Sequence, residues 1–261
     1  TFALQAGLID AAVLTDSKGM IAEPCLVTRV EDIFKCASSK FMAAPTVAML
    51  NQGVTERYRK MGIVGTPCQL TAVAQMRTNP TQKEDFVDPV ALTLGLFCNW
   101  ALDTRRLERH LSEKVDVSGI RGMDIPPPPA NMMVLDTDTG RVEVPLSEIK
   151  PLIPETCFIC PDMSAEFSDL SVGMYEGRPG WNTLIVRTEK GAELVEKAGR
   201  EGFLETEEFP AENLKHLSGA AADKKARAMR TLIRRELINT KNGKRSAVRM
   251  SPEVVDKLLK K

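Results

Sequence analysis

The stretch Gly62-Ile63-Val64-Gly65-Thr66-Pro67-Cys68 decides the fold, because a short apolar run ends at Gly and Pro directly before a helix-like segment at 69–76. A second unit has the same pattern, with an apolar run over 90–97 that ends at Cys98 and precedes a helical pattern over 102–111. Strands that are apolar throughout and alternate with helices are typical of an α/β sheet buried on both faces. The sequence therefore predicts a mostly parallel sheet flanked by helices.

Other apolar runs predict the elements around this core. Short runs at 11–14 and 183–187 predict two further strands. The runs 132–135 and 142–144 flank an Asp/Gly turn and predict an inserted β-hairpin. Four consecutive prolines at 126–129 exclude a helix there and predict an extended connector. Helical patterns complete the set, at 31–35, 47–59, 192–198, 220–237 and from Ser251 onward.

Length and composition limit the class of protein. The 261 residues suit one large domain, or one domain with a small appendage, and 43% apolar with 27% charged residues is ordinary for a soluble globular protein. No run of about 18 apolar residues predicts a transmembrane helix. The start has no secretory signal, so we expect a cytoplasmic protein. Because the chain begins at Thr1 and not at Met, we expect residues upstream of it.

Charge divides the chain into two parts. The total is zero, but residues 213–261 hold 14 Lys and Arg against 4 Asp and Glu, so this segment carries +10 and residues 1–212 carry −10. We therefore predict a body at 1–212 and a basic helical extension at 213–261. The apolar positions of the extension form one narrow stripe, Met229, Leu232, Ile233 and Leu237. We expect the extension to bind an acidic partner and no nucleic acid, with a solvated helix or an intramolecular clasp as alternatives.

Four of the six cysteines suggest a metal centre. Cys157 and Cys160 form a C-x-x-C pair in a proline-bracketed loop, and two thiolates at this spacing can bind one centre. Cys68 and Cys98 each follow a predicted strand, at the edge of a parallel sheet where α/β folds bind ligands. Together the four suit one [4Fe–4S] cluster or one zinc ion. The alternatives are a redox pair at 157–160 and a buried structural role for Cys68 and Cys98.

Other residues near this edge are suited to a cofactor. The segment 65–68 leads into a helix N-terminus, whose N–H groups attract phosphate. Ser38-Ser39-Lys40 adds hydroxyls and a cation, and the Gly-rich loop at 173–182 allows backbone to approach a ring system. The sequence contains no G-x-G-x-x-G fingerprint and no Walker A loop. Four further side chains are interpreted as structural or surface residues: Cys25, Cys36, His110 and His216.

Taken in order, six motifs resemble the family of the coenzyme F420-reducing hydrogenase β subunit, which includes deazaflavin-linked formate dehydrogenase β subunits. The match runs from Thr1 to about Phe209, and its motifs lie at 38–45, 65–69, 95–98, 157–162, 167–173 and 180–188. The family implies FAD beside a [4Fe–4S] cluster, with a hydride exchanged with coenzyme F420 and single electrons passed through the cluster. Two features depart from the family: only Thr1 remains of its Gly-Gly-x-Val-Thr flavin segment, and the extension lies beyond the family core.

The resemblance also implies roles for individual residues. The implied cluster ligands are Cys68, Cys98, Cys157 and Cys160. The residues implied to surround FAD are Ser39, Lys40, Thr66, Asn99, Ser171, Gly180 and Trp181. No catalytic side chain is expected, because the flavin carries the hydride chemistry.

The resemblance implies an electron-transfer subunit whose partners are the other subunits of a hydrogenase or formate dehydrogenase complex. Two alternatives remain from the sequence. One is a non-catalytic iron–sulfur or zinc scaffold subunit. The other is a family member that uses another acceptor, such as ferredoxin.

Overall fold

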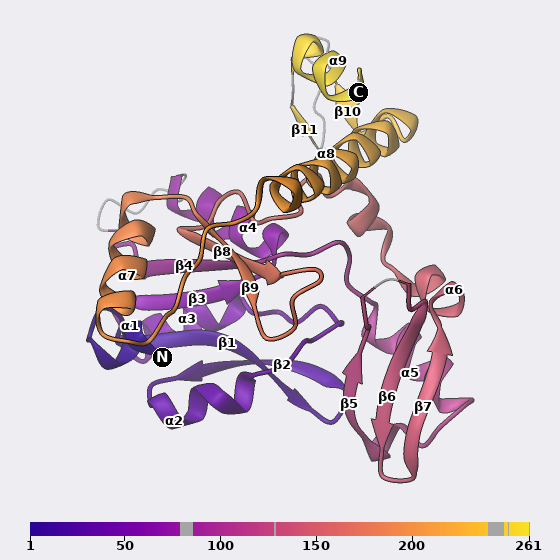
Figure 1. Cartoon of the computed structure of the whole chain (residues 1–261), viewed down its shortest axis with the longest axis horizontal. Coiled ribbons are helices and arrows are strands. Elements are labelled where there is room, and N and C mark those ends of the chain that lie inside the picture. Colours follow the sequence, from indigo (N-terminus) through magenta and orange to yellow (C-terminus); the bar gives the residue numbers. More distant parts are fainter. Residues whose placement is uncertain (79–85, 128, 240–247, 250, 261) are drawn as a thin grey trace.

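A six-stranded sheet forms the centre of the computed structural model, which describes residues 1–78, 86–127, 129–239, 248–249 and 251–260 (Figure 1). The strand order is β2-β1-β3-β4-β8-β9, in which β1, β3, β4 and β8 run parallel and the two edge strands run antiparallel. The prediction of a mostly parallel sheet is therefore confirmed. The strands are β1 (Ala11–Lys18), β2 (Ile21–Val27), β3 (Met61–Gly65), β4 (Val90–Leu96), β8 (Leu170–Met174) and β9 (Asn182–Val186).

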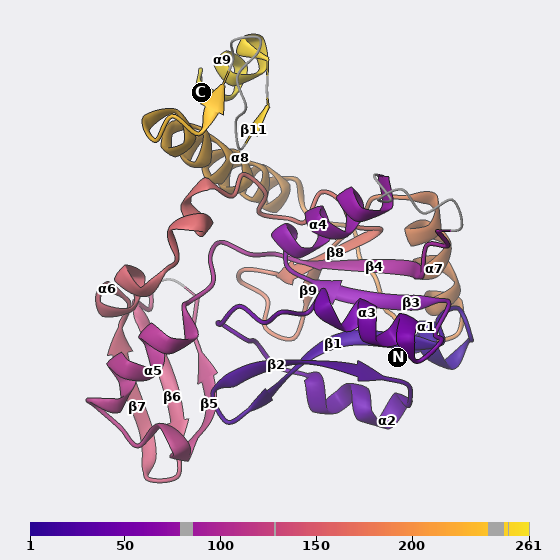
Figure 2. The ribbon, with the colours of Figure 1, turned by 180° about the vertical axis from the view of Figure 1, so that it is seen from behind.

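Helices cover both faces of this sheet (Figures 1 and 2). The alternation of β1 shows why: Val13 points into a core with α3 (Ala48–Thr55) and α4 (Pro67–Thr78), whereas Leu14 points into a core with α1 (Phe2–Gln5) and α7 (Glu189–Arg200). The predicted helices at 69–76 and 192–198 thus lie inside α4 and α7. The helical pattern at 31–35 is divided between α2 (Val30–Ile33) and the 3₁₀ turn η1 (Phe34–Cys36).

A second sheet of three antiparallel strands stands beside the first (Figure 1). Its strands β6 (Met132–Thr137) and β7 (Gly140–Pro145) are the predicted hairpin, and β5 (Ile120–Asp124) adds a strand that the sequence analysis missed. Helix α5 (Thr104–Ser112) packs on this sheet through Leu107 and Leu111, and the carboxylate of Asp103 caps its first turn.

Residue 128 of the four-proline stretch lies outside the described residues, and its neighbours have no regular structure. Short helices follow the hairpin: α6 (Leu146–Ile149), the 3₁₀ turns η3 (Lys150–Leu152) and η4 (Glu155–Ile159), with η2 (Val117–Gly119) before β5.

The basic extension forms a long helix that packs on the chain itself. Helix α8 spans Ala211–Arg234. The predicted helix was 220–237, so α8 begins before residue 220 and ends before residue 237. Met229 and Leu232 of the predicted stripe are buried against Ile159 of η4 and against residues of the C-terminal segment. That segment contains the ladder β10 (Ile238–Asn239) and β11 (Val248–Arg249) and helix α9 (Pro252–Leu259). Met229, Leu232 and Leu237 of the stripe are thus covered intramolecularly, as in the alternative of an intramolecular clasp, whereas Ile233 stays 42% exposed.

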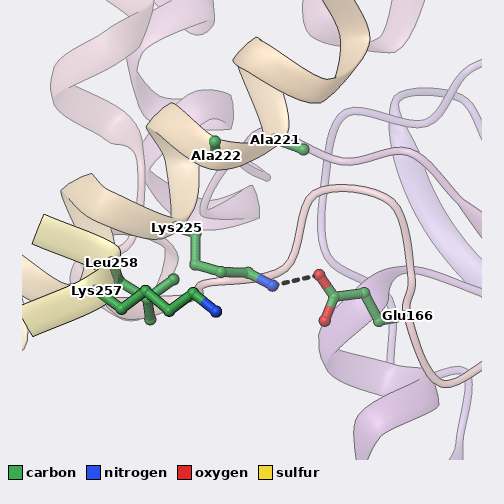
Figure 3. Close-up of a pocket in the computed structure, with 6 residues that line it drawn as sticks. All are labelled: Glu166, Ala221, Ala222, Lys225, Lys257 and Leu258. Carbon is green, nitrogen blue, oxygen red and sulfur yellow. Dashed lines mark hydrogen bonds and ion pairs between the residues drawn. The ribbon is translucent and has the colours of Figure 1, made fainter. Parts of the chain in front are cut away.

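Ion pairs add to the attachment of α8. Lys225 pairs with Glu166, at a pocket between α8, α9 and the loop before β8 (Figure 3). Arg235 pairs with Glu155 of η4 at 3.2 Å. Basic residues of the extension therefore meet acidic residues of the body, as the opposite charges of the two parts require. Among the described residues, no helix has the length and apolar character that a membrane crossing requires.

Asp169 joins three elements and gives a stability prediction. Its buried carboxylate accepts hydrogen bonds from the backbone N–H of Thr93 (2.8 Å), the hydroxyl of Thr93 (2.9 Å) and the hydroxyl of Thr188 (2.8 Å), which caps α7. We expect Asp169→Ala to lower the free energy of unfolding by about 3 kcal/mol, because it leaves buried donors unpaired. Urea denaturation measures this. The exposed Asp138, paired with Arg121, is the control, and Asp138→Ala should lower the free energy of unfolding far less than Asp169→Ala; equal losses would contradict the prediction.

Candidate cofactor site

Loops from three parallel strands meet at one edge of the large sheet. Because β3, β4 and β8 run parallel, the segments that follow them, 66–68, 97–99 and 175–181, leave the sheet at the same side. The loop at 157–163 lies against the segment after β4: the Cys98 N–H donates to the Met163 carbonyl at 2.8 Å, and the Ala101 N–H donates to Cys157 Sγ at 3.5 Å. The edge therefore gathers two distant stretches of sequence.

Gly95 of β4 allows the loop after Cys160 to approach the sheet. A Cβ at this position would lie 2.2 Å from the Cβ of Ala165 and 2.9 Å from Ser168 Oγ, distances that side chains do not adopt. Ala165 itself is fully buried and has a positive φ of 57°, so the loop turns sharply where it meets the strand. The missing side chain at Gly95 thus permits the close packing that holds the C-x-x-C loop at the edge.

The four predicted ligand thiols lie around this point. Cys68 is in the first turn of α4 and exposed, Cys98 follows β4, and Cys157 and Cys160 lie in and directly after η4. Burial, with smaller contributions from the neighbouring thiols of Cys68, Cys157 and Cys160, raises the pKa of the Cys98 thiol to about 12. Within the described residues, no three His, Cys, Asp or Glu side chains are close enough to hold a single metal ion.

A lysine of α8 reaches into the same point. Lys224 is 4% exposed, and its ammonium donates to the carbonyl of Cys98 at 2.5 Å and to the carbonyl of Asp162 at 2.8 Å. In the part of the chain that the structure describes, this ammonium makes no ion pair with a carboxylate. Its charge instead opposes the effect of burial, because it lowers the pKa of both Cys98 and Cys160. Lys224 is therefore a buried cation that lies close to the thiols of Cys98 and Cys160.

Thr66 and Gln69 organise the loop beside the thiols. The side-chain carbonyl of Gln69 accepts hydrogen bonds from the Thr66 N–H at 2.8 Å and from the Thr66 hydroxyl at 3.1 Å, which holds the start of α4 as a capping box does. The amide nitrogen of Gln69 donates to the Ala44 carbonyl at 2.7 Å. The Leu102 N–H donates to the Phe41 carbonyl at 2.8 Å, so the loop at 37–46 is fastened to the segments after β3 and after β4.

Ser39 and Lys40 belong to that fastened loop. Ser39 is exposed, and the ammonium of Lys40 donates to the Ser38 hydroxyl at 2.7 Å and to the Ala37 carbonyl at 3.2 Å. Ser38 has a backbone φ of 103°, which is rare for a residue other than glycine. The cation thus stabilises a tight turn at the sheet edge.

The remaining predicted flavin residues differ in access. Asn99 is exposed after β4, and Gly180 and Trp181 lie in the β8–β9 hairpin, where the guanidinium of Arg178 stacks on the Trp181 ring at 3.9 Å. Ser171 is fully buried, and its hydroxyl accepts a hydrogen bond from Arg187 at 2.7 Å. Ser171 is therefore not among the accessible residues, because it occupies a position of β8 whose side chain faces the protein interior.

Comparison with known proteins assigns the family. Two family models match the chain: the N-terminal region of the coenzyme F420 hydrogenase/dehydrogenase β subunit at residues 1–51, and its C-terminal region at residues 58–212. The chain belongs to the family of coenzyme F420 hydrogenase/dehydrogenase β subunits. The resemblance predicted from the six motifs is thereby confirmed.

Individual relatives in this family of β subunits agree with the match. The coenzyme F420 hydrogenase β subunit of Methanococcus voltae is 30% identical over 220 residues, 78% of this chain and 74% of that protein. One subunit of the F(420)H(2) dehydrogenase of Methanosarcina mazei is 31% identical over 189 residues, 71% of this chain and 52% of that protein. A chain in the solved F420-reducing [NiFe] hydrogenase complex from Methanosarcina barkeri superposes with a TM-score of 0.80 at 26% identity, and the match covers 90% of this chain and 82% of that one.

The matched region of the family of β subunits contains all four thiols but ends at residue 212, before Lys224. Lys224 was not predicted from the sequence, because the many basic residues of the extension indicated a charged outer surface. A signal was nevertheless present. Lys224, Ala228 and Thr231 are spaced i, i+4 and i+7, and all three are buried on one face of α8.

Proposed function

We propose that this β subunit is the point in a hydrogenase or formate dehydrogenase complex where a hydride from or to coenzyme F420 is converted into single electrons. When bound, FAD and a [4Fe–4S] cluster supply that conversion, since a flavin exchanges both hydrides and single electrons. The family supports the role of a β subunit in such a complex. The observation that carries the cofactor proposal is the buried ammonium of Lys224 beside the thiols of Cys98 and Cys160, with Cys68 and Cys157 close to Cys98.

The charge of Lys224 argues for anionic sulfur. A buried ammonium is costly unless negative charge lies close to it, and two backbone carbonyls supply only partial charge. Thiols with raised pKa values are neutral at physiological pH, so they do not balance the charge. Binding to iron deprotonates them, and four thiolates are the usual ligand set of a [4Fe–4S] cluster. The donor set therefore fits the group that the family implies.

The chain's own residues define the rest of the site. Cys68, Cys98, Cys157 and Cys160 would hold the cluster, while Lys224 fixes the loops of Cys98 and Asp162 by hydrogen bonds. For FAD, the start of α4 would offer N–H groups and Lys40 a cation to the pyrophosphate.

Anaerobic purification tests the proposal directly. We expect about four iron and four sulfide per chain, together with flavin absorbance. We also expect reduction of an artificial one-electron acceptor by reduced F420. One zinc per chain with neither sulfide nor flavin would instead indicate a scaffold subunit. Flavin and cluster without F420 turnover would indicate another electron carrier, such as ferredoxin.

Lys40 gives a prediction for the flavin. We expect Lys40→Ala to increase the loss of flavin on gel filtration about 10-fold, because it removes a charge-assisted contact and loosens the turn at Ser38. Flavin fluorescence per chain after denaturation measures the retained cofactor. Lys35→Ala is the control, since Lys35 lies on the preceding turn and pairs with Asp32. Equal flavin contents in both variants and the unaltered protein would refute the role of Lys40.

A further inference from the structure

The two cysteines outside the proposed cluster site face each other. The Sγ atoms of Cys25 and Cys36 are 3.3 Å apart, although the sequence analysis interpreted both residues as structural. Cys25 lies in edge strand β2, opposite Leu14 of β1, and Cys36 is the last residue of η1. Both residues are half-buried, so the pair packs on the core beneath it and stays accessible from one side.

This geometry suits a covalent bond between the two sulfurs. A disulfide needs an S–S distance of about 2.05 Å, so the sulfurs must close by a little over 1 Å, which small side-chain rotations can supply. Their elements are neighbours: η1 contacts β1, the strand that pairs with β2, so the bond asks for little backbone rearrangement. Burial and the adjacent Cys25 raise the pKa of Cys36 to about 12, so this sulfur stays a protonated thiol until it reacts with the mixed disulfide at Cys25.

We propose that Cys25 and Cys36 form a reversible dithiol–disulfide site that exchanges with an external disulfide. Cys25 loses its proton, and its thiolate attacks one sulfur of the external disulfide, breaks the S–S bond and releases one thiolate, which takes up a proton. Cys36 then attacks the Cys25 sulfur of the mixed disulfide, loses its proton and displaces the second thiolate. The pair gives up two electrons and two protons, and the external disulfide becomes two thiols.

A disulfide between Cys25 and Cys36 would restrain the loop at 37–46. It would join β2 to the residue directly before Ala37, whose carbonyl accepts a hydrogen bond from Lys40. The start of the 37–46 loop would then be fixed covalently to the sheet edge. This consequence, unlike the bond itself, rests on the proposed function, in which that loop holds FAD. We expect the oxidised pair to release flavin more slowly, because a restrained loop loses less entropy on binding.

The sequence around the pair makes the bond easy to detect. Trypsin cuts after Lys18, Arg29, Lys35 and Lys40, so Cys25 and Cys36 fall in the separate peptides 19–29 and 36–40. The full chain, purified anaerobically, is incubated with oxidised glutathione, alkylated with iodoacetamide and digested without reductant. We expect mass spectrometry to find the two peptides linked, at least about 10-fold above glutathione adducts of either, because the second thiol is held at high effective concentration.

Serine variants complete the test. In Cys25→Ser and Cys36→Ser the linked peptides must disappear, and the remaining cysteine should carry glutathione or alkyl groups. Recovery of both cysteines of the unaltered chain only as alkylated thiols or glutathione adducts would overturn the proposal. The flavin release rate is compared before and after oxidation, with Cys36→Ser as the control. A linked pair with no change in flavin release would keep the site and remove its effect on the loop, and a chain without flavin would contradict the proposed function alone.

Discussion

Cys98→Ser is expected to abolish the iron–sulfur centre, with iron and acid-labile sulfide falling from about four each to below one per chain. Cys98 is the most informative of the four thiols, because the other three all lie close enough to affect its pKa. Serine keeps the size of the side chain but replaces the thiolate by a hydroxyl, a poor ligand for iron. The brown colour and the absorbance of the cluster near 400 nm should vanish together.

The other five cysteines supply the comparison variants for this prediction. Serine at Cys68, Cys157 or Cys160 should have the same effect, since each would supply one of four bonds. Cys25→Ser and Cys36→Ser are matched controls and should retain full iron and sulfide. A Cys98→Ser protein that kept four iron per chain, with circular dichroism like that of the unaltered chain, would show that Cys98 is no ligand.

The second large effect is expected at Lys224. Lys224→Met keeps the length of the side chain and removes its charge, so the cluster should become harder to reduce. One buried charge beside a one-electron centre is worth on the order of 2 kcal/mol, which corresponds to a fall in reduction potential of about 100 mV. A redox titration monitored by electron paramagnetic resonance measures the potential of the cluster independently of turnover.

Two further variants separate charge from packing. Lys224→Arg keeps the charge and should hold the potential near that of the unaltered protein, even if the larger head group lowers stability. Lys225→Met removes the same charge from the adjacent residue, where the side chain is only partly buried and pairs with Glu166. It should change the potential little. Equal potentials in Lys224→Met and Lys225→Met would refute a specific role for Lys224, while the presence of iron would leave the cluster itself supported.

The central strands were predictable because their signal is local. The apolar run before Thr66 and the run before Cys98 end at turn residues, and both became β3 and β4 with helices after them. Strand β2 was missed because it is an edge strand that contains Glu23 and Pro24, which weaken the apolar pattern. Strand β8 was missed for a different reason, since its Leu170-Ser-Val-Gly-Met174 sequence mixes small and polar residues.

The candidate site shows the same division between local and tertiary information. Parallel strand topology alone predicts that Cys68 and Cys98 lie at one edge, and the structure places them there. No local pattern shows that Ser171 faces the interior, because this depends on the register of β8 against β4 and β9. The burial of Lys224 depends on where α8 lands on the body, far along the chain from the thiols.

The packing of α8 over the C-x-x-C loop also sets an order of events during biosynthesis. The four thiols leave the ribosome before residues 211–234, so the body can begin to fold while the loop of Cys157 and Cys160 is still uncovered. Iron delivered at that stage would reach the thiols before α8 covers the loop. Once α8 docks on η4 and Lys224 is enclosed, the same helix covers the loop of Cys157 and Cys160. A helix that is made after all four thiols would thus act as a closing step, which favours retention of the cluster over its exchange.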